Sequence, residues 1–361
     1  MPAKRGPGSR VAKFWLADLG VPVATLPMEA RLVDALPSGE GWQFEPKWDG
    51  FRCLAFRAGD EVELRAKSGK SLTRYFPDIV DSIRKAAVDR FVVDGELAIP
   101  VGDSLSFDDL QLRLHPAESR VRKLALETPA IFILFDCLLA KNNRSLLDAP
   151  LRERRKALEG LFESLSDIAA FRLSPYTPKR TEAQKWLNKS GGALDGVIAK
   201  RLDGPYVSGE RDMLKIKCLR TADCVVGGFR YAQGTKEVGS MLLGLYNDKG
   251  KLDHVGFTAT ISNAERDALT KKLEKLRRPP GFDGNAPGGP SRWSTGRTGE
   301  WEPLAPKLVA EVRYDHMSGD RFRHSTKFLR WRPDKAPKQC TFDQLQREAK
   351  PSTLVAKVLE A

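Results

Sequence analysis

The spacing of apolar and polar residues predicts a mixed α and β domain in the first part of the chain. Alternating runs, and apolar runs bounded by turn residues, predict strands at residues 52–57, 61–65, 91–99, 130–139 and 196–200. Residues 77–88 and 151–165 instead carry apolar side chains at helical spacing, with charges on the opposite face. These elements predict an α+β domain that ends close to Cys218.

The remainder of the chain has a different pattern, in which short strands predominate. Strands are predicted at residues 224–229, 240–246, 253–260 and 308–314, and only residues 264–276 have a clear helical pattern. Residues 278–299 are dense in Gly, Pro and Ser, which predicts an exposed loop inside a small β domain. We therefore expect an N-terminal extension (1–22), a first domain (23–218), a second domain (219–345) and a C-terminal tail (346–361).

The charge balance favours a polyanionic partner. The 361 residues include 60 Lys and Arg against 47 Asp and Glu, a net charge of +13. Basic side chains bind phosphates and release counterions, so nucleic acid is the first candidate and an acidic membrane surface the second. A solvated basic surface remains the alternative. Because no run of about 18 apolar residues occurs, we expect a soluble, unexported protein without a membrane span.

The five cysteines and four histidines indicate neither a disulfide framework nor a zinc site. No two cysteines form a C-x-x-C pair, and the histidines lack the paired spacing of zinc ligands. We therefore expect reduced cysteines, which are typical of the cytosol, and no zinc.

The segment FEPKWDGFR (residues 44–52) is the most informative stretch of the chain. A lysine amine attacks phosphorus only when it is unprotonated, so the pKa of Lys47 would have to fall below its usual value of about 10.4. Burial or a neighbouring cation such as Arg52 would have that effect. The alternative is a polar hairpin turn, because Asp49-Gly50 between half-apolar runs is a strong hairpin signal.

Two strands carry carboxylates that suit a metal site. Alternation places Asp94 and Glu96 on one face, where they could hold Mg²⁺ or bind a ribose hydroxyl; the alternative is an acidic strand edge facing solvent. Asp195 precedes an apolar strand and Lys200 ends it, which suggests a second metal ligand and a phosphate-binding base. A buried strand flanked by a turn explains that pattern almost as well.

Three further patterns are candidates for nucleotide binding. Lys215 and Lys217 share one face of a predicted strand and could bind a triphosphate, although an amphipathic surface strand is the alternative. Phe135 lies in an almost wholly apolar run and could either contact an adenine or pack in the core. The segment RWRPDK (residues 330–335) concentrates three cations and suits pyrophosphate or a nucleic-acid backbone.

These motifs occur in an order that resembles the motif set of covalent nucleotidyltransferases, specifically ATP-dependent DNA ligases: EPKWDGFR, VVDGE, FILFD, DGVIAK, LKIK and RWRPDK. The resemblance extends from about Leu26 to Leu345 and is strongest to the compact bacterial LigC type, which is related to the ligase module of LigD. It implies an α+β nucleotidyltransferase domain of ATP-grasp-like fold, followed by a β-barrel OB-fold domain.

The resemblance also implies a mechanism. Lys47 attacks the α-phosphorus of ATP, expels pyrophosphate and forms a lysyl-AMP intermediate. AMP is then transferred to the 5′-phosphate at a DNA nick, and the 3′-hydroxyl displaces AMP and closes the backbone.

The matching positions carry further implied roles. Glu96 and Asp195 are expected to bind Mg²⁺ or Mn²⁺, and Lys67 is expected to contact the 5′-phosphate of the nick. The residues expected to contact ATP are Glu45 (through its backbone), Arg52, Glu96, Phe135, Lys200, Lys215 and Lys217 in the first domain, with Arg332, Asp334 and Lys335 orienting pyrophosphate from the second.

Three positions depart from the family pattern. Asp195 stands where Glu is more common, which shortens its reach toward a metal by one methylene. Lys67 stands where many ligases have Arg, and a lysine cannot form a bidentate fork with phosphate. Met213 occupies a place often held by Trp.

The expected partner is nicked duplex DNA, bound by a monomer that is cytoplasmic and nucleoid-associated. The resemblance suggests DNA repair or end joining, with a repair polymerase, a primase or an end-binding protein as a further partner. RNA end ligation and guanylyltransfer for capping share the lysine and carboxylate motifs. A noncatalytic OB-fold nucleic-acid-binding protein would explain the charge but not Lys47, Glu96 or the LKIK pair.

Overall fold

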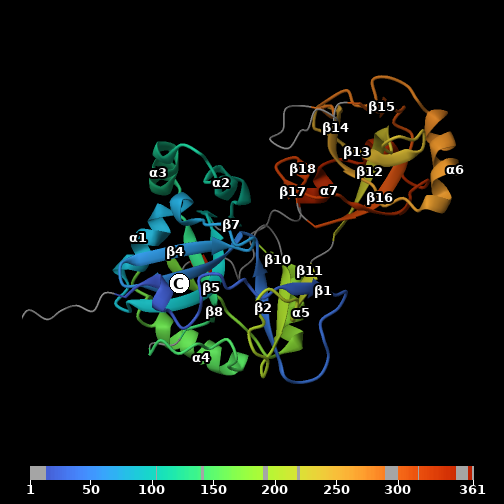
Figure 1. Ribbon diagram of the computed structural model, residues 1–361. Coiled ribbons are helices and arrows are strands. Elements are labelled where there is room, and N and C mark those ends of the chain that lie inside the picture. Colours follow the sequence, from blue (N-terminus) through green and yellow to red (C-terminus); the bar gives the residue numbers. More distant parts are fainter. Residues whose placement is uncertain are drawn as a thin grey trace, which may run out of the picture. The chain divides into compact units, whose positions relative to one another are not determined.

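The computed structural model describes residues 14–102, 104–139, 142–189, 194–217, 220–288, 300–315, 317–346 and 357–359. The chain forms two compact units (Figure 1). The first comprises Met1–Ile216 together with Pro351–Ala361, and the second comprises Lys217–Lys350.

The larger sheet of the first unit has the strand order β4-β3-β5-β8-β9. Its strands are β3 (Phe51–Ala58), β4 (Glu61–Ala66), β5 (Arg90–Ala98), β8 (Ile131–Cys137) and β9 (Phe171–Leu173), antiparallel except for the β8–β9 pair. Helices α1 (Pro77–Lys85) and α4 (Leu151–Phe162) pack on it. All seven residues of β8 are buried, because both of its faces are covered. The continuous apolar run therefore reflects a central strand.

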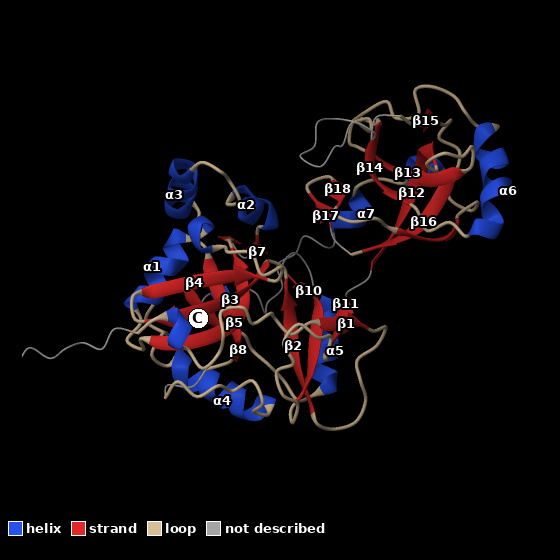
Figure 2. Ribbon diagram, viewed as in Figure 1, coloured by secondary structure: helices blue, strands red, loops and turns tan. Residues whose placement is uncertain are grey.

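The smaller sheet of the first unit has the order β1-β11-β10-β2. It contains β1 (Ala30–Leu32), β2 (Trp42–Trp48), β10 (Leu194–Arg201) and β11 (Met213–Lys217), with α5 (Arg180–Lys189) against β2 and β10 (Figure 2). Because β2 and β3 belong to different sheets, the hairpin interpretation of Asp49-Gly50 is wrong. The turn connects the two sheets instead.

Glycine is required in that turn. A Cβ atom at Gly50 would lie 2.2 Å from the carbonyl oxygen of Leu97 and 2.9 Å from Cγ of Glu96. Both Glu96 and Leu97 belong to β5. The chain therefore passes directly over β5 between Trp48 and Phe51, at a distance that no other residue permits without a shift.

The second unit is a small β domain. Its sheet has the order β14-β13-β12-β16-β19, formed by β12 (Arg220–Tyr231), β13 (Val238–Tyr246), β14 (Leu252–Thr258), β16 (Val309–Tyr314) and β19 (Lys327–Trp331), with β15 (Glu302–Pro303) beside β12. The amide of Thr326 donates to the carbonyl of Phe257 at 3.1 Å, and Thr258 bridges to Thr326. These bonds join the two edges of the sheet and close it into a barrel. Helix α6 (Asn263–Glu274) packs on β13.

Two sequence expectations change in the described residues. The segment 278–288 contains no helix or strand, as expected of a loop, but Phe282 is buried in the core of the second unit, so the loop is not wholly exposed. Residues 289–299 lie outside the described part of the chain.

The second expectation concerns the C-terminal tail (346–361). Val358 is buried in one apolar cluster with Trp48 and Phe135 of the first unit. The guanidinium of Arg172 donates to the carbonyl of Leu359 at 3.2 Å, so residues 358 and 359 are attached to the first unit.

The periodicity did not reveal several short elements. Helix α3 (Glu118–Glu127) buries only Val121 and Ala125, so its apolar face is too narrow to give a clear helical signal. Strands β1, β2, β9, β15 and β19 and helix α5 were not predicted from the sequence either. The other elements that were not predicted are η1 (Leu16–Asp18), η2 (Thr73–Tyr75), β6 (Pro100–Val101), β7 (Ser104–Leu105), α2 (Phe107–Leu112), β17 (Met317–Ser318), β18 (Arg321–Phe322), η3 (Pro337–Gln339) and α7 (Asp343–Gln346). No helix of the described residues has the length and apolar character needed to cross a membrane.

Replacing Gly160 with alanine should stabilise the first unit. Gly160 lies inside α4, and a Cβ atom there would meet no other atom within 4 Å. We expect Gly160→Ala to raise the free energy of unfolding by about 0.5–1 kcal/mol, because alanine loses less backbone entropy in a helix. Urea unfolding measures the change.

The contrasting variant is Gly95→Ala in β5. Its Cβ atom would lie 2.6 Å from both the carbonyl oxygen of Ile133 and the ring of Phe132. We expect a loss of about 1–3 kcal/mol, because the packed strand has no room for the methyl group. Equal effects of the two substitutions would contradict this account of the packing.

Candidate nucleotide-binding and catalytic site

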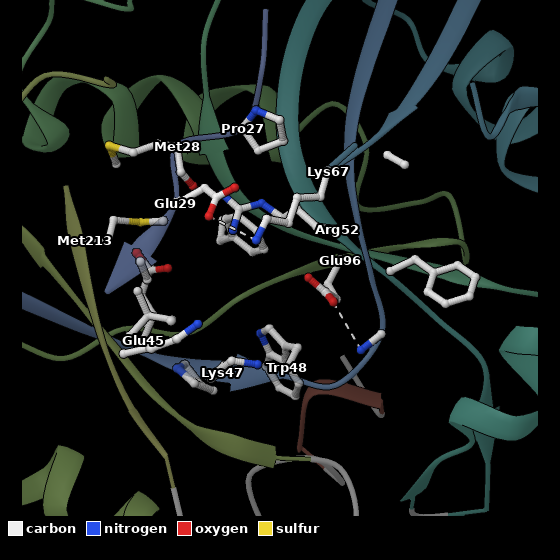
Figure 3. A pocket seen from close by; sticks show the side chains of 18 of the residues that line it. Pro27, Met28, Glu29, Glu45, Lys47, Trp48, Arg52, Lys67, Glu96 and Met213 are labelled. Carbon is white, nitrogen blue, oxygen red and sulfur yellow. Dashed lines mark hydrogen bonds and ion pairs between the residues drawn. The ribbon is translucent and has the colours of Figure 1, made fainter. Parts of the chain in front are cut away.

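A cavity of about 700 Å³ lies where the two sheets of the first unit meet. This volume is within the usual range for a small-molecule site. Its lining comes from β2, β10 and β11 of the smaller sheet and from β3, β5 and β8 of the larger one. The cavity brings together eight of the residues proposed from the sequence: Glu45, Lys47, Arg52, Lys67, Glu96, Phe135, Lys200 and Lys215. Figure 3 labels Glu45, Lys47, Arg52, Lys67 and Glu96 in the lining of this cavity.

Lys47 lies on β2 and forms an ion pair with Asp195. Its Nζ is 2.6 Å from Oδ2 of Asp195, whose side chain is almost completely buried. Gly196 pairs with Lys47 and Leu194 pairs with Trp48, so Asp195 is the extra residue of a β-bulge in β10. A bulge redirects a side chain within a strand, and here it places the carboxylate beside the lysine amine. The sequence predicted both residues but not the bulge.

Glu96 lies on the other sheet and faces the same cavity. The amide of Gly50 donates to Oε1 of Glu96 at 3.1 Å. Burial raises the pKa of the Glu96 carboxyl to about 7, although the charges of Lys47 and Arg52 oppose the shift. The carboxyl group therefore changes its protonation near neutral pH.

Arg52 is held in place by Asp94. Its Nε and Nη2 lie 2.5 and 2.6 Å from the two carboxylate oxygens of Asp94, a bidentate arrangement. The hydroxyl of Tyr206 also donates to Oδ2 of Asp94 at 2.5 Å. Asp94 is fully buried, so it orients Arg52 and is not available as the partner of Glu96 in a metal site. No pattern in the sequence linked Tyr206 to this network.

Phe135 forms one wall of the cavity between two cations. The guanidinium carbon of Arg52 lies 4.5 Å from the centroid of its ring, and Nζ of Lys200 lies 4.9 Å from it. Nζ of Lys200 is also 2.8 Å from Oε2 of Glu45, and both side chains are almost completely buried. Lys200 thus holds the wall of the cavity around Phe135, whereas a phosphate-binding base was expected at this position from the sequence.

Lys67 is more exposed than the other cations of the cavity. Its Nζ lies 3.1 Å from Oε2 of Glu29, and Nε of Arg211 lies 3.6 Å from the same oxygen. The hydrogen bond from Lys67 lowers the pKa of Glu29. Because the side chain of Lys67 is 59% exposed, it remains accessible to a ligand from solvent.

The other three predicted cations belong to the second unit. Nη1 of Arg332 lies 3.0 Å from each carboxylate oxygen of Asp223, and Nζ of Lys335 lies 2.8 Å from Oδ2 of the same residue. Lys217 donates to Oδ2 of Asp315 at 2.7 Å. Although Lys215 and Lys217 are only two residues apart, Lys215 lines the cavity of the first unit and Lys217 bonds within the second.

The acidic residues beside Lys47 fit a divalent cation that also binds phosphate. Glu96 and Asp195 carry carboxylate oxygens, the hard donor atoms that suit Mg²⁺ or Mn²⁺. Among the described residues no group of three or more Asp, Glu, His or Cys side chains could hold a metal ion. A cation at Lys47 would therefore take its remaining ligands from water and from the phosphates of a nucleotide, as Mg²⁺ commonly does.

Comparisons with known proteins agree with this geometry. Residues 27–217 match a family described as ATP dependent DNA ligase domain, and residues 234–335 match the ATP dependent DNA ligase C terminal region. DNA ligase C1 of Mycolicibacterium smegmatis is 46% identical over 339 residues, which cover 91% of this chain and 95% of that protein. DNA ligase C of Mycobacterium tuberculosis is 44% identical over 337 residues, covering 89% and 93%.

A solved structure of a Lig E DNA ligase has the same fold, with a TM-score of 0.52 and 17% identity over 84% of this chain and 99% of that one. These matches confirm the nucleotidyltransferase domain followed by an OB-fold domain. With two family models in the expected order and relatives similar over nearly their whole length, this chain belongs to the ATP-dependent DNA ligase family.

Proposed function

We propose that this protein seals nicks between a 5′-phosphate and a 3′-hydroxyl in duplex DNA, using ATP and a lysyl-AMP intermediate on Lys47. The observation that carries this proposal is the position of Lys47, whose amine lies in one cavity with the carboxylate of Glu96 and beside that of Asp195. Adenylylation is assigned to residues 23–218 and the OB-fold domain to residues 219–345. The family of the chain supports ATP and DNA as substrates.

In the first step, the adenine of ATP packs against Phe135 and the ribose lies toward Glu96 and Arg52. The amine of Lys47 loses a proton and attacks the α-phosphorus. An N–P bond forms while the bond to pyrophosphate breaks. Asp195 is 2.6 Å from Nζ and is placed to receive the proton. Lys215 contacts the α-phosphate, while Arg332, Asp334 and Lys335 orient pyrophosphate.

Mg²⁺ or Mn²⁺ would be held by Glu96 and Asp195 and would neutralise negative charge on the phosphates. Asp195 meets Lys47 directly, so its carboxylate must divide its interactions between the amine and a cation. Glu96 lies on the other sheet and accepts a hydrogen bond from the amide of Gly50. Within the described residues Lys47 forms its ion pair with Asp195 and not with Glu96. Glu96 is therefore the principal metal ligand in this proposal.

The remaining two steps use the nick. The 5′-phosphate, which Lys67 contacts, attacks the phosphorus of lysyl-AMP and releases the amine. The 3′-hydroxyl then attacks the 5′-phosphorus and displaces AMP. The net charge of +13 favours binding to the DNA backbone.

The cellular setting is part of the same proposal. A ligase that repairs genomic DNA works at the nucleoid, so we expect the protein in the cytoplasm. We also expect it to act as a monomer. A multifunctional non-homologous end joining protein, LigD of Mycolicibacterium smegmatis, is 28% identical over 307 residues, which cover 84% of this chain and 37% of that protein. This relative supports a role in repair or end joining alongside a repair polymerase, a primase or an end-binding protein.

Replacement of Lys47 tests the nucleophile. Incubation with labelled ATP and Mg²⁺ or Mn²⁺ should give protein-linked AMP, and Lys47→Ala should reduce it to background because no other amine occupies that position. Lys70→Ala, which changes an exposed lysine outside the cavity lining, should label like the wild type. Equal labelling of Lys47→Ala would exclude Lys47 as the nucleophile.

The same assay separates the alternatives. Labelling by GTP and not by ATP would indicate capping chemistry. Nicked duplexes with a DNA or an RNA 3′ end, compared side by side, distinguish DNA sealing from RNA end ligation. A protein that binds DNA without forming any lysyl-AMP would be the noncatalytic OB-fold alternative.

The pKa of Glu96 predicts how the metal requirement depends on pH. The carboxyl is neutral below a pKa of about 7 and charged above it, so the apparent affinity for Mn²⁺ should fall as the pH falls through 7. We expect a loss of about tenfold for each pH unit below the pKa, measured as the Mn²⁺ concentration that half-saturates adenylylation. Glu96→Gln should bind Mn²⁺ weakly at every pH. An equally steep profile in Glu96→Gln would assign the titration to another group.

A further inference from the structure

The second unit contains a cluster of two cations around one carboxylate. Arg332 and Lys335 both contact Asp223, which lies on β12 outside every motif that suggested catalysis. Nη1 of Arg332 is 3.0 Å from both oxygens of Asp223, and Nζ of Lys335 is 2.8 Å from one of them. A single carboxylate therefore sets the separation between the two cationic groups.

Asp223 is itself fixed by its backbone. Its amide donates to Oε1 of Gln344 at 2.8 Å, and its carbonyl accepts from Nε2 of Gln344 at 3.1 Å. Its strand pairs with β16, where Glu311 is its direct partner. The amide of Arg332 donates to the carbonyl of Val309, also on β16, at 2.8 Å. Asp223 and Arg332 are thus attached to adjacent strands of one sheet, so their relative position is well defined.

The two carboxylates on Arg332 differ in exposure. The side chain of Asp223 is 13% exposed, whereas that of Asp334 is 61% exposed. Asp334 binds Nε and Nη2 of Arg332 at 3.0 and 2.8 Å. Asp223 therefore holds the guanidinium from the protein side, and Asp334 contacts it where solvent can compete.

The charge of the cluster depends on Asp334. With Asp223 and Asp334 both on the cations the net charge is zero, whereas an anion that displaces the exposed Asp334 meets two cations and one carboxylate, a net charge of +1. Without Asp223 the two cations would repel each other and their long side chains would adopt many rotamers. The carboxylate lowers the total charge but preserves the arrangement.

We propose that Asp223 is a positioning residue for pyrophosphate: it holds Arg332 and Lys335 at the separation with which they bind the leaving group of Lys47 adenylylation. This inference rests on the proposed function, in which these two cations orient pyrophosphate. As the N–P bond to Lys47 forms, the α-phosphorus–oxygen bond breaks and the electron pair remains on pyrophosphate, the anion that the two cations bind in this proposal. In the reverse reaction a pyrophosphate oxygen attacks the phosphorus of lysyl-AMP and releases the amine. Asp223 transfers no proton in either direction.

The test compares Asp223→Asn with the wild type in three separate steps. Single-turnover experiments measure formation of lysyl-AMP from ATP, its reversal by pyrophosphate, and sealing of a nick that already carries AMP. We expect the KM for pyrophosphate in reversal to rise about tenfold or more, as losses of supporting contacts commonly cause. Sealing of the pre-adenylylated nick needs no pyrophosphate, so its rate should stay within about twofold, in line with an intact interaction with DNA.

Two further variants separate positioning from folding. Asp223→Glu keeps the charge and should recover part of the pyrophosphate affinity. Glu302→Gln removes an ion pair with Arg277 in the same unit and should leave pyrophosphate affinity unchanged. Thermal unfolding of each variant shows whether the second unit is intact.

Several outcomes would overturn the proposal. An unchanged KM for pyrophosphate in Asp223→Asn would show that Asp223 does not position the cations. A lower KM would show that Asp223 competes with pyrophosphate, and equal losses in all three steps would indicate a structural role alone. A wild-type protein that forms no lysyl-AMP would overturn the proposed function itself, and this inference with it. A normal wild type with normal reversal in Asp223→Asn overturns only the inference.

Discussion

The close passage of the chain over β5 at Gly50 is the constraint on which the candidate site depends. Gly50 lies between β2, which carries Lys47, and β3, which carries Arg52, and these strands belong to different sheets. Its amide binds Glu96, and no Cβ atom fits between its backbone and the carbonyl of Leu97. The sheets therefore meet where the lysine amine and the carboxylate face one cavity.

Opposite charges organise the rest of the site. Four cations of the cavity lie beside carboxylates: Lys47 with Asp195, Arg52 with Asp94, Lys200 with Glu45, and Lys67 with Glu29. A buried ion pair adds little net stability, because removing both charges from water is costly. The buried pairs of Arg52 and Lys200 instead fix these side chains around Phe135, whereas the exposed Lys67 is held loosely. The same principle recurs in the second unit, where Asp223 holds Arg332 and Lys335.

The sequence predicted the chemistry of the site better than its geometry. Lys47, Glu96 and Asp195 were identified because motifs of this family are short and local in sequence. Strand alternation indicates only a shared face, so it could not show that Asp94 binds Arg52 while Glu96 faces the cavity. The hairpin interpretation of Asp49-Gly50 was wrong for a similar reason, because a turn signal does not specify which sheet the next strand joins. Many strands were predicted, but β2, which carries Lys47, and helices α3 and α5 were not. Helix α3 buries too few residues to give a helical signal.

The most direct test of this account is the mass of the peptide that contains Lys47, after incubation of the protein with ATP and Mg²⁺. The wild type should carry AMP on Lys47. Gly50→Ala should carry little AMP, because the added methyl group would push β5 away from the turn and move Glu96 away from the cavity that holds the Lys47 amine. Circular dichroism shows whether this variant is folded. Full adenylylation of folded Gly50→Ala, at the wild-type rate, would contradict the claim that this contact assembles the site.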